Sequence, residues 1–440
     1  MKQEPTGAFE VATVLNDIFS ADHRYREATL SLTANENYPS ELVRVTSGST
    51  AGAFYHVSFP FDVPDGEWHF PEPGHMHAVA DKVRSLGKSL LHAQTFDWRP
   101  NGGSAAEQAL MLAACQPGDG FVHFAHGDGG HFALEALASK AGIEIFHLPV
   151  DPDTLLIDVD RLAALVDAHP RIRIVILDQS FKLRWQPLRA IRDALPAHCT
   201  LTYDASHDGG LVMGGWFDSP LRCGADVVHG NTHKTIAGPQ KAYIAFGSAE
   251  HPLLADTSIW VCPNIQSNCH AEQLPSMWVA LKEIEVYGLA YASQVVRNAA
   301  ALARALHARG LDVSGESFGF TETHQVHFSV GTPEDALLTC RDILHRGGIR
   351  TTNIELPGKP GMHGIRLGVQ AMTRRGMVER DFETAADFIA ALCTRKRTPE
   401  EVAPDVATFL GDFPLSPLAF SFDSGMTDAL RAALRQGVMR

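Results

Sequence analysis

A lysine and an aspartate, thirty residues apart, are the side chains of this sequence best placed to do chemistry. Lys234 follows an apolar run at residues 225–228 and precedes a Gly-Pro turn. An amine where a strand ends can shed water and lose its proton more easily than one on a solvated helix face. Asp204 directly follows a second strand-like run, residues 199–203. Pyridoxal phosphate requires a lysine for a Schiff base and an aspartate for its pyridinium nitrogen, so the pair indicates that cofactor.

A Gly-Gly-Ser sequence precedes a helical run at residues 105–114 and is a candidate for binding the cofactor's phosphate. Gly102, Gly103 and Ser104 are small enough to let backbone amides approach an anion, and a helix N-terminus adds favourable partial charge. The pattern is neither the P-loop nor the dinucleotide fingerprint. Without context it is equally compatible with a plain turn and helix cap.

Strand-like and helical runs alternate through the first part of the chain. The strand candidates are residues 121–124, 143–150, 172–177, 199–203, 226–228 and 242–246, and the helical ones include 132–140, 159–168 and 188–195. Such alternation predicts an α/β fold with a mostly parallel sheet covered on both faces and ligands at the carboxyl ends of the strands. Asp204, Ser180 and the turn at residues 126–131 all follow strand ends, so we expect them in one site.

The chain of 440 residues is too long for one core, and we divide it into three parts. Residues 1–40 form an arm, whose amphipathic helix at 8–25 would pack on a partner subunit or on the C-terminal domain. Residues 41–290 form the large domain and residues 291–440 the small one. A long helix at about 276–309 connects these two. The small domain is expected to be α+β, with strands at 324–330 and 364–367 and helices near 378–394, 398–411 and 425–437.

Composition narrows the class of protein. A net charge of −14 with no basic run argues against a nucleic-acid partner. No apolar run reaches membrane-spanning length, and no signal peptide is recognisable at the N-terminus. Seven cysteines without CxxC pairs indicate reduced thiols, so we expect a cytoplasmic protein. The histidine pairs 75/77 and 126/131 have no matching third and fourth ligands, so no metal site is expected.

Several stretches, taken together, resemble the serine hydroxymethyltransferase branch of the fold-type-I pyridoxal-phosphate enzymes. They are Leu-Thr-Ala-Asn-Glu-Asn-Tyr at residues 32–38, Gly-Gly-His at 129–131, Asp-Ala-Ser-His at 204–207, Thr-His-Lys-Thr at 232–235 with Gly-Pro at 238–239, and residues 364–376. The resemblance implies a fold-type-I transferase with a mostly parallel seven-stranded sheet, helices on both faces and a smaller α+β C-terminal domain. It also implies a homodimer with active sites shared across the interface. A tetramer made of two such dimers is the alternative assembly.

The same resemblance assigns the residues that bind the cofactor. Lys234 would carry the Schiff base, Asp204 would pair with the pyridine nitrogen, and His131 would stack on the ring. The other cofactor residues it implies are Gly102, Gly103 and Ser104 at the phosphate, His207 and Ser180 near the ring oxygen, His233 beside the lysine, and Ser267 near a phosphate contact from the second subunit.

For the substrate, the resemblance implies that Arg366 grips the amino-acid carboxylate and that Tyr55 reaches in from the neighbouring subunit. Asn35 stands where the family has a substrate-contacting serine, and Glu107 where the family has an asparagine. The family's folate chemistry uses a glutamate two residues after the tyrosine, a position occupied here by Val57, which cannot transfer a proton. Folate-dependent chemistry is therefore disfavoured, while the pyridoxal-phosphate machinery is complete.

Within the family, the chain is most similar to L-threonine transaldolases, notably at residues 31–38, 68–76 and 180–187. This similarity implies cleavage of L-threonine to acetaldehyde and transfer of the glycyl unit to an aldehyde. We expect residues 68–73 to form a lid over the aldehyde pocket. The product would be a β-hydroxy-α-amino acid of secondary metabolism. The general base is open among Tyr55, His131 and a water held by Glu107. The alternatives are a serine or α-methylserine hydroxymethyltransferase, with or without folate, and a catalytically inactive binding protein with this fold.

Overall fold

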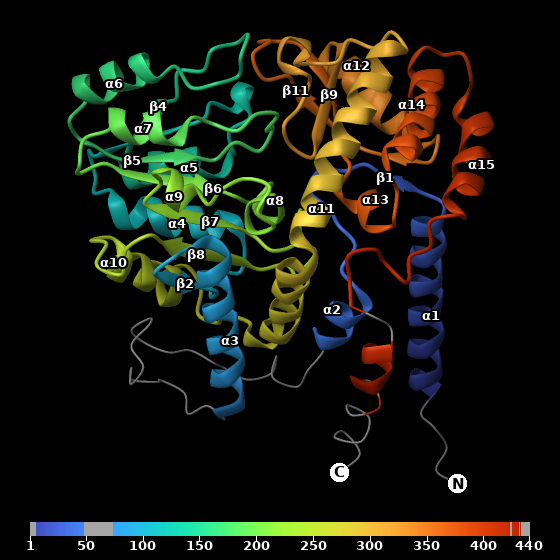
Figure 1. The fold of residues 1–440 in the computed structure, drawn as a ribbon, viewed down its shortest axis with the longest axis horizontal. Coiled ribbons are helices and arrows are strands. Elements are labelled where there is room, and N and C mark those ends of the chain that lie inside the picture. The colour runs from blue at the N-terminus through green and yellow to red at the C-terminus, as the bar shows by residue number, and fades with distance from the viewer. Residues whose placement is uncertain (1–5, 48–73, 423–424, 431, 433–440) are drawn as a thin grey trace.

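The computed structural model describes residues 6–47, 74–422, 425–430 and 432, and a seven-stranded sheet forms its larger half (Figure 1). The sheet order is β2 (Thr95–Asp97), β8 (Ala242–Phe246), β7 (Val227–Asn231), β6 (Thr200–Asp204), β5 (Ile172–Leu177), β3 (Gly120–His123) and β4 (Glu144–His147). The strands from β7 to β4 pair in parallel, and only β8 runs antiparallel to its neighbours. The predicted mostly parallel seven-stranded sheet is confirmed, although β2 had not been recognised.

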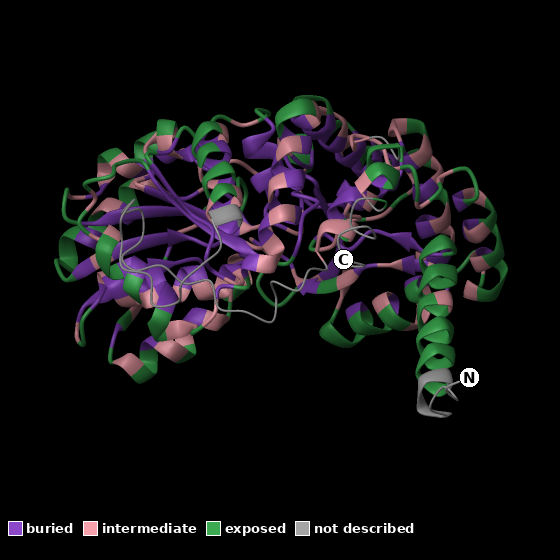
Figure 2. Cartoon of the chain, turned by 90° about the horizontal axis from the view of Figure 1, so that it is seen from below, coloured by how far each residue is buried: buried purple, intermediate pink, exposed green. Residues whose placement is uncertain are grey.

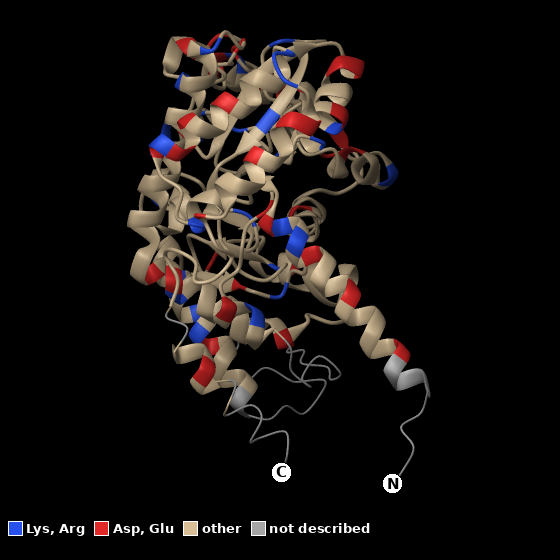
Figure 3. Ribbon diagram, turned by 90° about the vertical axis from the view of Figure 1, so that its right-hand side faces the viewer, with Lys and Arg blue, Asp and Glu red and all other residues tan. Residues whose placement is uncertain are grey.

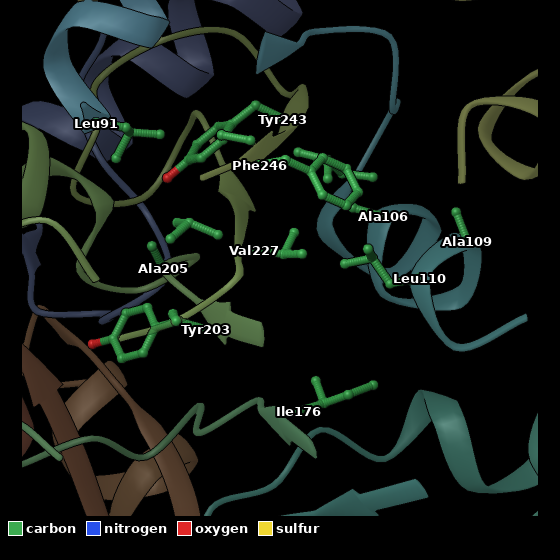
Figure 4. Packing of buried hydrophobic residues seen from close by; sticks show 14 of the residues in the cluster. Leu91, Ala106, Ala109, Leu110, Ile176, Tyr203, Ala205, Val227, Tyr243 and Phe246 are labelled. Carbon is green, nitrogen blue, oxygen red and sulfur yellow. The ribbon is translucent and has the colours of Figure 1, made fainter. Parts of the chain in front are cut away.

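The central strands are continuous apolar runs because both faces of the sheet are covered. In β5, for example, five of the six residues are buried. On one face the strands pack against α4 (Gly103–Ala114), whose Ala106, Ala109 and Leu110 are fully buried. Figure 4 shows these side chains close to Val227 and Phe246 of the sheet. This packing fixes the N-terminus of α4 beside the carboxyl ends of the strands.

Helices alternate with the strands as expected for parallel crossovers. They are α3 (Gly74–Leu91), α4, α5 (Ala133–Ala141), α6 (Val159–Ala168), α7 (Leu188–Ala194), α8 (Gly209–Met213), α9 (Pro220–Cys223) and α10 (Leu254–Ile259). The Asp158 side chain begins α6 by accepting a hydrogen bond from the Arg161 backbone N–H, as an N-cap residue does.

A second core surrounds a three-stranded antiparallel sheet of order β11 (Thr352–Glu355), β12 (His363–Gly368) and β9 (Gln325–Gly331). A short parallel pair, β1 (Leu30–Ser31) with β10 (Ile349–Arg350), lies beside it. The helices of this half are α12 (Pro333–Leu338), α13 (Gln370–Arg374), α14 (Glu379–Cys393) and α15 (Pro399–Leu410). The strands expected at 324–330 and 364–367 correspond to β9 and β12.

One long helix, α11 (Leu274–Ala308), runs through both cores (Figure 1). Met277 and Leu281 pack into the core of the large sheet, whereas Val295 and Leu302 pack into the second core. Gly288 lies between these halves, where a Cβ would come within 2.8 Å of the Cα of Gly214. The domain boundaries at 40 and 290 stay a prediction, because this helix contributes to both cores.

The N-terminal helix α1 (Thr6–Glu27) extends away from the body, whereas α2 (Glu41–Thr46) packs against α11 (Figures 2 and 3). Acidic and basic residues are interspersed along the ribbon in Figure 3. Tyr55, Val57 and the expected lid at residues 68–73 lie outside the described residues, as does much of the helix expected at 425–437. Among the described helices, none is long and apolar enough to cross a membrane.

Candidate active site

The predicted chemical groups gather at the carboxyl ends of four neighbouring parallel strands. Asp204 is the last residue of β6, and Lys234 follows β7 by three residues. Ser180 follows β5 by three residues, and His131 lies in the connection between β3 and α5. Because parallel strands present their carboxyl ends at one edge of a sheet, these residues share one site.

Asp204 is buried and firmly positioned. Its Oδ1 accepts a hydrogen bond of 2.7 Å from the Ser206 backbone N–H and lies 3.8 Å from Nε2 of His229. Its backbone carbonyl accepts a 3.2 Å hydrogen bond from the buried amine of Lys182. Among the described residues, Oδ2 has no hydrogen-bond donor, so this oxygen can pair with a protonated ring nitrogen.

Lys234 is partly buried, and its amine makes no hydrogen bond or ion pair with any described residue. Its backbone carbonyl accepts a 2.6 Å hydrogen bond from the side-chain amide of Asn37. Burial lowers the pKa of Lys234, against the opposing effect of the Asp204 carboxylate. A lowered pKa increases the fraction of neutral amine, which is the form that attacks a carbonyl.

The His131 imidazole contacts the carboxylate of Glu107 on α4. Its Nδ1 is 3.2 Å from Oε2 of Glu107, and Oε1 of that residue is 3.7 Å from Nε2 of His229. Glu107 raises the pKa of His131 despite the opposing effect of burial. His131 Nδ1 and Glu107 Oε2 contact each other as an ion pair, and His229 Nε2 has no hydrogen-bond partner among the described residues. Buried polar atoms without partners are rare, so this group fits the polar edge of a bound aromatic cofactor.

A buried carboxylate holds the loop that carries His131. Asp178 Oδ2 accepts a 2.9 Å hydrogen bond from the His131 backbone N–H, and Oδ1 accepts one of 3.0 Å from the Phe124 N–H. Asp178 directly follows β5, so the strand that leads to Ser180 also fixes the position of the His131 backbone.

The N-terminus of α4 fits a phosphate. Its N-cap residue Gly102 offers no side-chain hydrogen bond, and the Ser104 N–H in the first turn of this twelve-residue helix makes no hydrogen bond with any described residue. Gly103 donates its N–H to Oδ1 of Asn231 at 2.8 Å. A Cβ at position 103 would lie 2.7 Å from Asn231 Nδ2 and 2.9 Å from Ser206 Oγ, so only glycine allows this close approach. Ser104 follows it in the first turn.

Arg366 projects from β12 and connects the second core with the large sheet. Its Nε donates to Thr352 Oγ1 and its Nη1 donates to the Ser180 carbonyl, both at 3.2 Å. The guanidinium lies 5.1 Å from the centre of the Phe181 ring. Burial lowers the pKa of Arg366 to about 10, which leaves it charged at neutral pH and able to bind a carboxylate.

The histidines beside Lys234 are held in their neutral form. Burial, followed by the charge of Lys234, lowers the pKa of His207 well below its usual value. The same causes lower the pKa of His233 to about 4. His207 Nδ1 lies 3.3 Å from the side-chain amide of Gln325, which also donates to the Ser180 carbonyl at 3.0 Å. The imidazoles of His207 and His233 are therefore neutral, whereas that of His131 is more easily protonated.

Other predicted site residues are not joined to this group by contacts among the described residues. Asn35 is exposed and lines a surface hollow of about 370 Å³ together with Thr352. Ser267 is also exposed, although the carbonyl of its neighbour Asn268 accepts a 2.9 Å hydrogen bond from Asn101, next to the phosphate turn. Tyr55 lies outside the described residues. Their roles stay predictions.

Sequence reasoning had missed several residues that organise the site. They are Asn37, Asp178, His229, Asn231 and Gln325. Two of them, Asp178 and Asn231, lie at the end of, or just after, a buried strand of the parallel sheet, and a polar residue in that position was the available signal.

Comparison with known proteins agrees with this site. The family model described as serine hydroxymethyltransferase matches residues 10–389. The chain belongs to the serine hydroxymethyltransferase family. The serine hydroxymethyltransferase of Thermococcus gammatolerans is 33% identical over 94% of this chain and 97% of its own length, and that of Methanosphaera stadtmanae is 29% identical over 94% and 97%.

Among solved structures, the L-threonine transaldolase from Pseudomonas fluorescens in its internal aldimine state is much more similar. It is 69% identical in sequence, covers 99% of both chains and superposes with a TM-score of 0.96. Together with the family model, this likeness implies pyridoxal phosphate as the cofactor and confirms the fold-type-I architecture. The protein is a pyridoxal-phosphate enzyme of the transferase class.

Proposed function

We propose that the chain is an L-threonine transaldolase. It would cleave L-threonine to acetaldehyde and transfer the remaining glycyl unit to a second aldehyde, giving a β-hydroxy-α-amino acid. The observation that carries the proposal is the 69% identity to a named L-threonine transaldolase over 99% of both chains, against 29% and 33% to the two named hydroxymethyltransferases. The valine at position 57, where the family has its folate-related glutamate, supports the same reading.

Pyridoxal phosphate attached to Lys234 supplies an electron sink for the electrons of the bond that breaks at the substrate's α-carbon. Asp204, with Oδ2 directed to no other described donor, would keep the ring nitrogen protonated. The N-terminus of α4 at Gly102, Gly103 and Ser104, which has no side-chain cap from Gly102, would bind the phosphate group. These residues would hold both ends of the cofactor at the carboxyl edge of one sheet.

Arg366 would bind the substrate carboxylate and so fix which bond of the α-carbon is broken. Its guanidinium is already oriented by Thr352 and the Ser180 carbonyl, which reduces the entropy lost on binding. The base that takes the β-hydroxyl proton of threonine comes from one of three sources: Tyr55, His131 or a water held by Glu107. His131 and Glu107 are 3.2 Å apart, so they would act as one unit.

The decisive experiment incubates the purified holoenzyme with L-threonine and a panel of aryl and arylacetyl aldehydes. We expect acetaldehyde to be released in proportion to new β-hydroxy-α-amino acid, with Lys234→Ala as the inactive control. A hydroxymethyltransferase is the alternative: serine with tetrahydrofolate would react, and threonine with aldehyde would not. An inactive binding protein would release no acetaldehyde under either condition.

The exposed face of α1 supports assembly with a second copy of the chain, as the family resemblance implied. Val11, Val14, Ile18 and Phe19 recur at helical spacing, and each is at least half exposed. A homodimer would cover this stripe, which is wide for an isolated surface helix. Ile18→Asp with Phe19→Asp should shift the mass measured by light scattering toward the monomer, while Glu10→Gln should not.

The proposal also covers the cellular location and the metabolic role of the enzyme. All seven cysteines are free thiols, which fits a reducing, cytoplasmic location. A β-hydroxy-α-amino acid made from an aryl aldehyde fits a role in secondary metabolism. Cell fractionation and the product profile of a deletion strain would test these two proposals.

A further inference from the structure

Three side chains of types that can bind a metal lie together on the sheet, beside the active site. His123 and His147 are direct neighbours in the parallel pair β3–β4, so their side chains lie on the same face. Glu135, in the first turn of α5, completes the group. One ligand atom from each of the three lies within 4.8 Å of the other two.

The distances match those of a small tetrahedral ion. Glu135 Oε1 lies 3.4 Å from His123 Nε2 and 3.2 Å from His147 Nε2. Zinc–nitrogen and zinc–oxygen bonds of about 2.1 Å place tetrahedral ligands about 3.4 Å apart. Two imidazoles and one carboxylate also form a ligand set that zinc commonly uses, with a fourth position for water.

The position of His123 suits a ligand. Its Nδ1 lies 3.1 Å from Asp178 Oδ2, and an ionised carboxylate only accepts hydrogen bonds, so Nδ1 is the donor of this contact. Nε2 is therefore the nitrogen that can supply a lone pair to a cation held between it and the Glu135 carboxylate, and it has no hydrogen-bond partner among the described residues although the side chain is 1% exposed. A carboxylate that orients a metal-bound histidine in this way is typical of zinc sites.

Charge and access favour a divalent cation. Glu135 and Asp178 bring two negative charges to the cluster, which one divalent ion would neutralise. The Glu135 and His147 side chains are 42% and 49% exposed, so an ion can enter from solvent. The buried His123 side chain is held in place, whereas the exposed Glu135 and His147 side chains can change rotamer to complete the coordination of an ion.

We propose that His123, Glu135 and His147 bind a zinc-class divalent cation, outside the pyridoxal-phosphate site. The ion would link β3, β4 and α5. It would also brace Asp178, which holds the backbone of His131, and so stabilise the loop over the cofactor. The proposal differs from our expectation from sequence, in which no metal site had been recognised. It does not depend on which amino acid the enzyme cleaves.

The test uses the tag-free holoenzyme, depleted of metal by a chelator and titrated with Zn²⁺ in a calorimeter. We expect one equivalent to bind per chain, with a rise in the melting temperature because the ion binds only the folded state. His147→Ala and Glu135→Gln should each weaken binding at least tenfold, as loss of a ligand does. The visible absorption of the cofactor should stay unchanged throughout.

His198→Ala is the matched control, because His198 is exposed and far along the chain from the cluster. It should leave zinc binding unchanged. Binding that survives in both ligand variants would show that zinc binds elsewhere and would overturn the proposal. Absence of binding to the parent protein would also overturn it, and the cluster would then be an ion pair in which a protonated His123 bridges two carboxylates. A zinc-soaked crystal measured at the zinc absorption edge would locate the ion independently.

Discussion

Glu107 Oε2 lies 3.2 Å from Nδ1 of His131, in a site where the related hydroxymethyltransferases are expected to carry an asparagine. The carboxylate is buried at 2% exposure, whereas the imidazole is only partly buried. A buried acid beside this histidine favours the imidazolium form, which an asparagine would not do. The ring that would stack on the cofactor is therefore more easily protonated than an ordinary histidine.

Glu107→Gln should lower the pKa of His131, because the substitution removes the charge that raises it. The pH dependence of kcat/KM for threonine should move to lower pH, and the rate should fall on the order of tenfold to a hundredfold. A histidine with a raised native pKa stabilises the fold below its unfolded pKa of 6.5, and this contribution is lost as pH rises through the native pKa. The stability difference between parent and variant should therefore shrink above neutral pH. Glu144→Gln, at an exposed position, should change neither profile.

Lys234→Ala should abolish the visible absorption of the holoenzyme, because the other amine near Asp204, that of Lys182, is already bound to Asp208 and Tyr203. Turnover should fall by about a thousandfold or more, as expected when a covalent catalytic group is removed. Circular dichroism should be unchanged. Lys88→Ala, an exposed lysine of α3, serves as the control. A variant that keeps the absorption band would place the Schiff base on a different residue.

Arg366→Lys should raise the KM for threonine by roughly tenfold to a hundredfold, because an ammonium cannot form the paired hydrogen bonds of a guanidinium. The contacts to Thr352 and the Ser180 carbonyl would also be lost, so the new amine would be less well oriented. The affinity for the cofactor should change little. Steady-state kinetics, with Arg304→Lys on the exposed side of α11 as control, would check this split. Equal losses of substrate and cofactor binding would argue against a carboxylate-binding role.

Lys182→Met should destabilise the protein by about 3 to 5 kcal/mol, because it leaves a buried carboxylate without its cation. The Lys182 amine lies 3.0 Å from Asp208 Oδ2 and 3.0 Å from the Tyr203 hydroxyl. Urea unfolding would measure the loss. The double variant Lys182→Met with Asp208→Asn should recover part of it, since the uncompensated charge is then gone. A double variant no more stable than the single one would contradict this account.

The large parallel sheet could be predicted because most of its strands are apolar runs bounded by turns. β5 and β8 were placed at their observed bounds. β2 was missed because it has only three residues, Thr95–Asp97, too few to show a period. The same alternation of strands and helices predicted that Asp204 and Lys234 lie at the carboxyl ends of strands. The centre of the site could therefore be predicted from the sequence.

The remaining site residues could not be predicted because they depend on register and loop geometry. His123 and His147 are 24 residues apart and become neighbours only through the pairing of β3 with β4. Asp178 acquires its role only when the loop after β3 folds back over the end of β5. Asn35 fits the family motif, yet its side chain is exposed in this chain. A motif specifies the types of residues, whereas these contacts depend on the strand register and on the loop conformations between the motifs.

Helix α11 has a consequence for the choice of substrate. The amine and carboxylate of an α-amino acid are separated by a single carbon, yet Lys234 follows β7 of the large sheet and Arg366 lies on β12 of the small one. Helix α11 contributes side chains to both cores, so it holds the two sheets at a fixed separation. In the proposed reaction, a fixed span between these two groups would select amino acids with one carbon between amine and carboxylate, through a helix that itself touches no substrate.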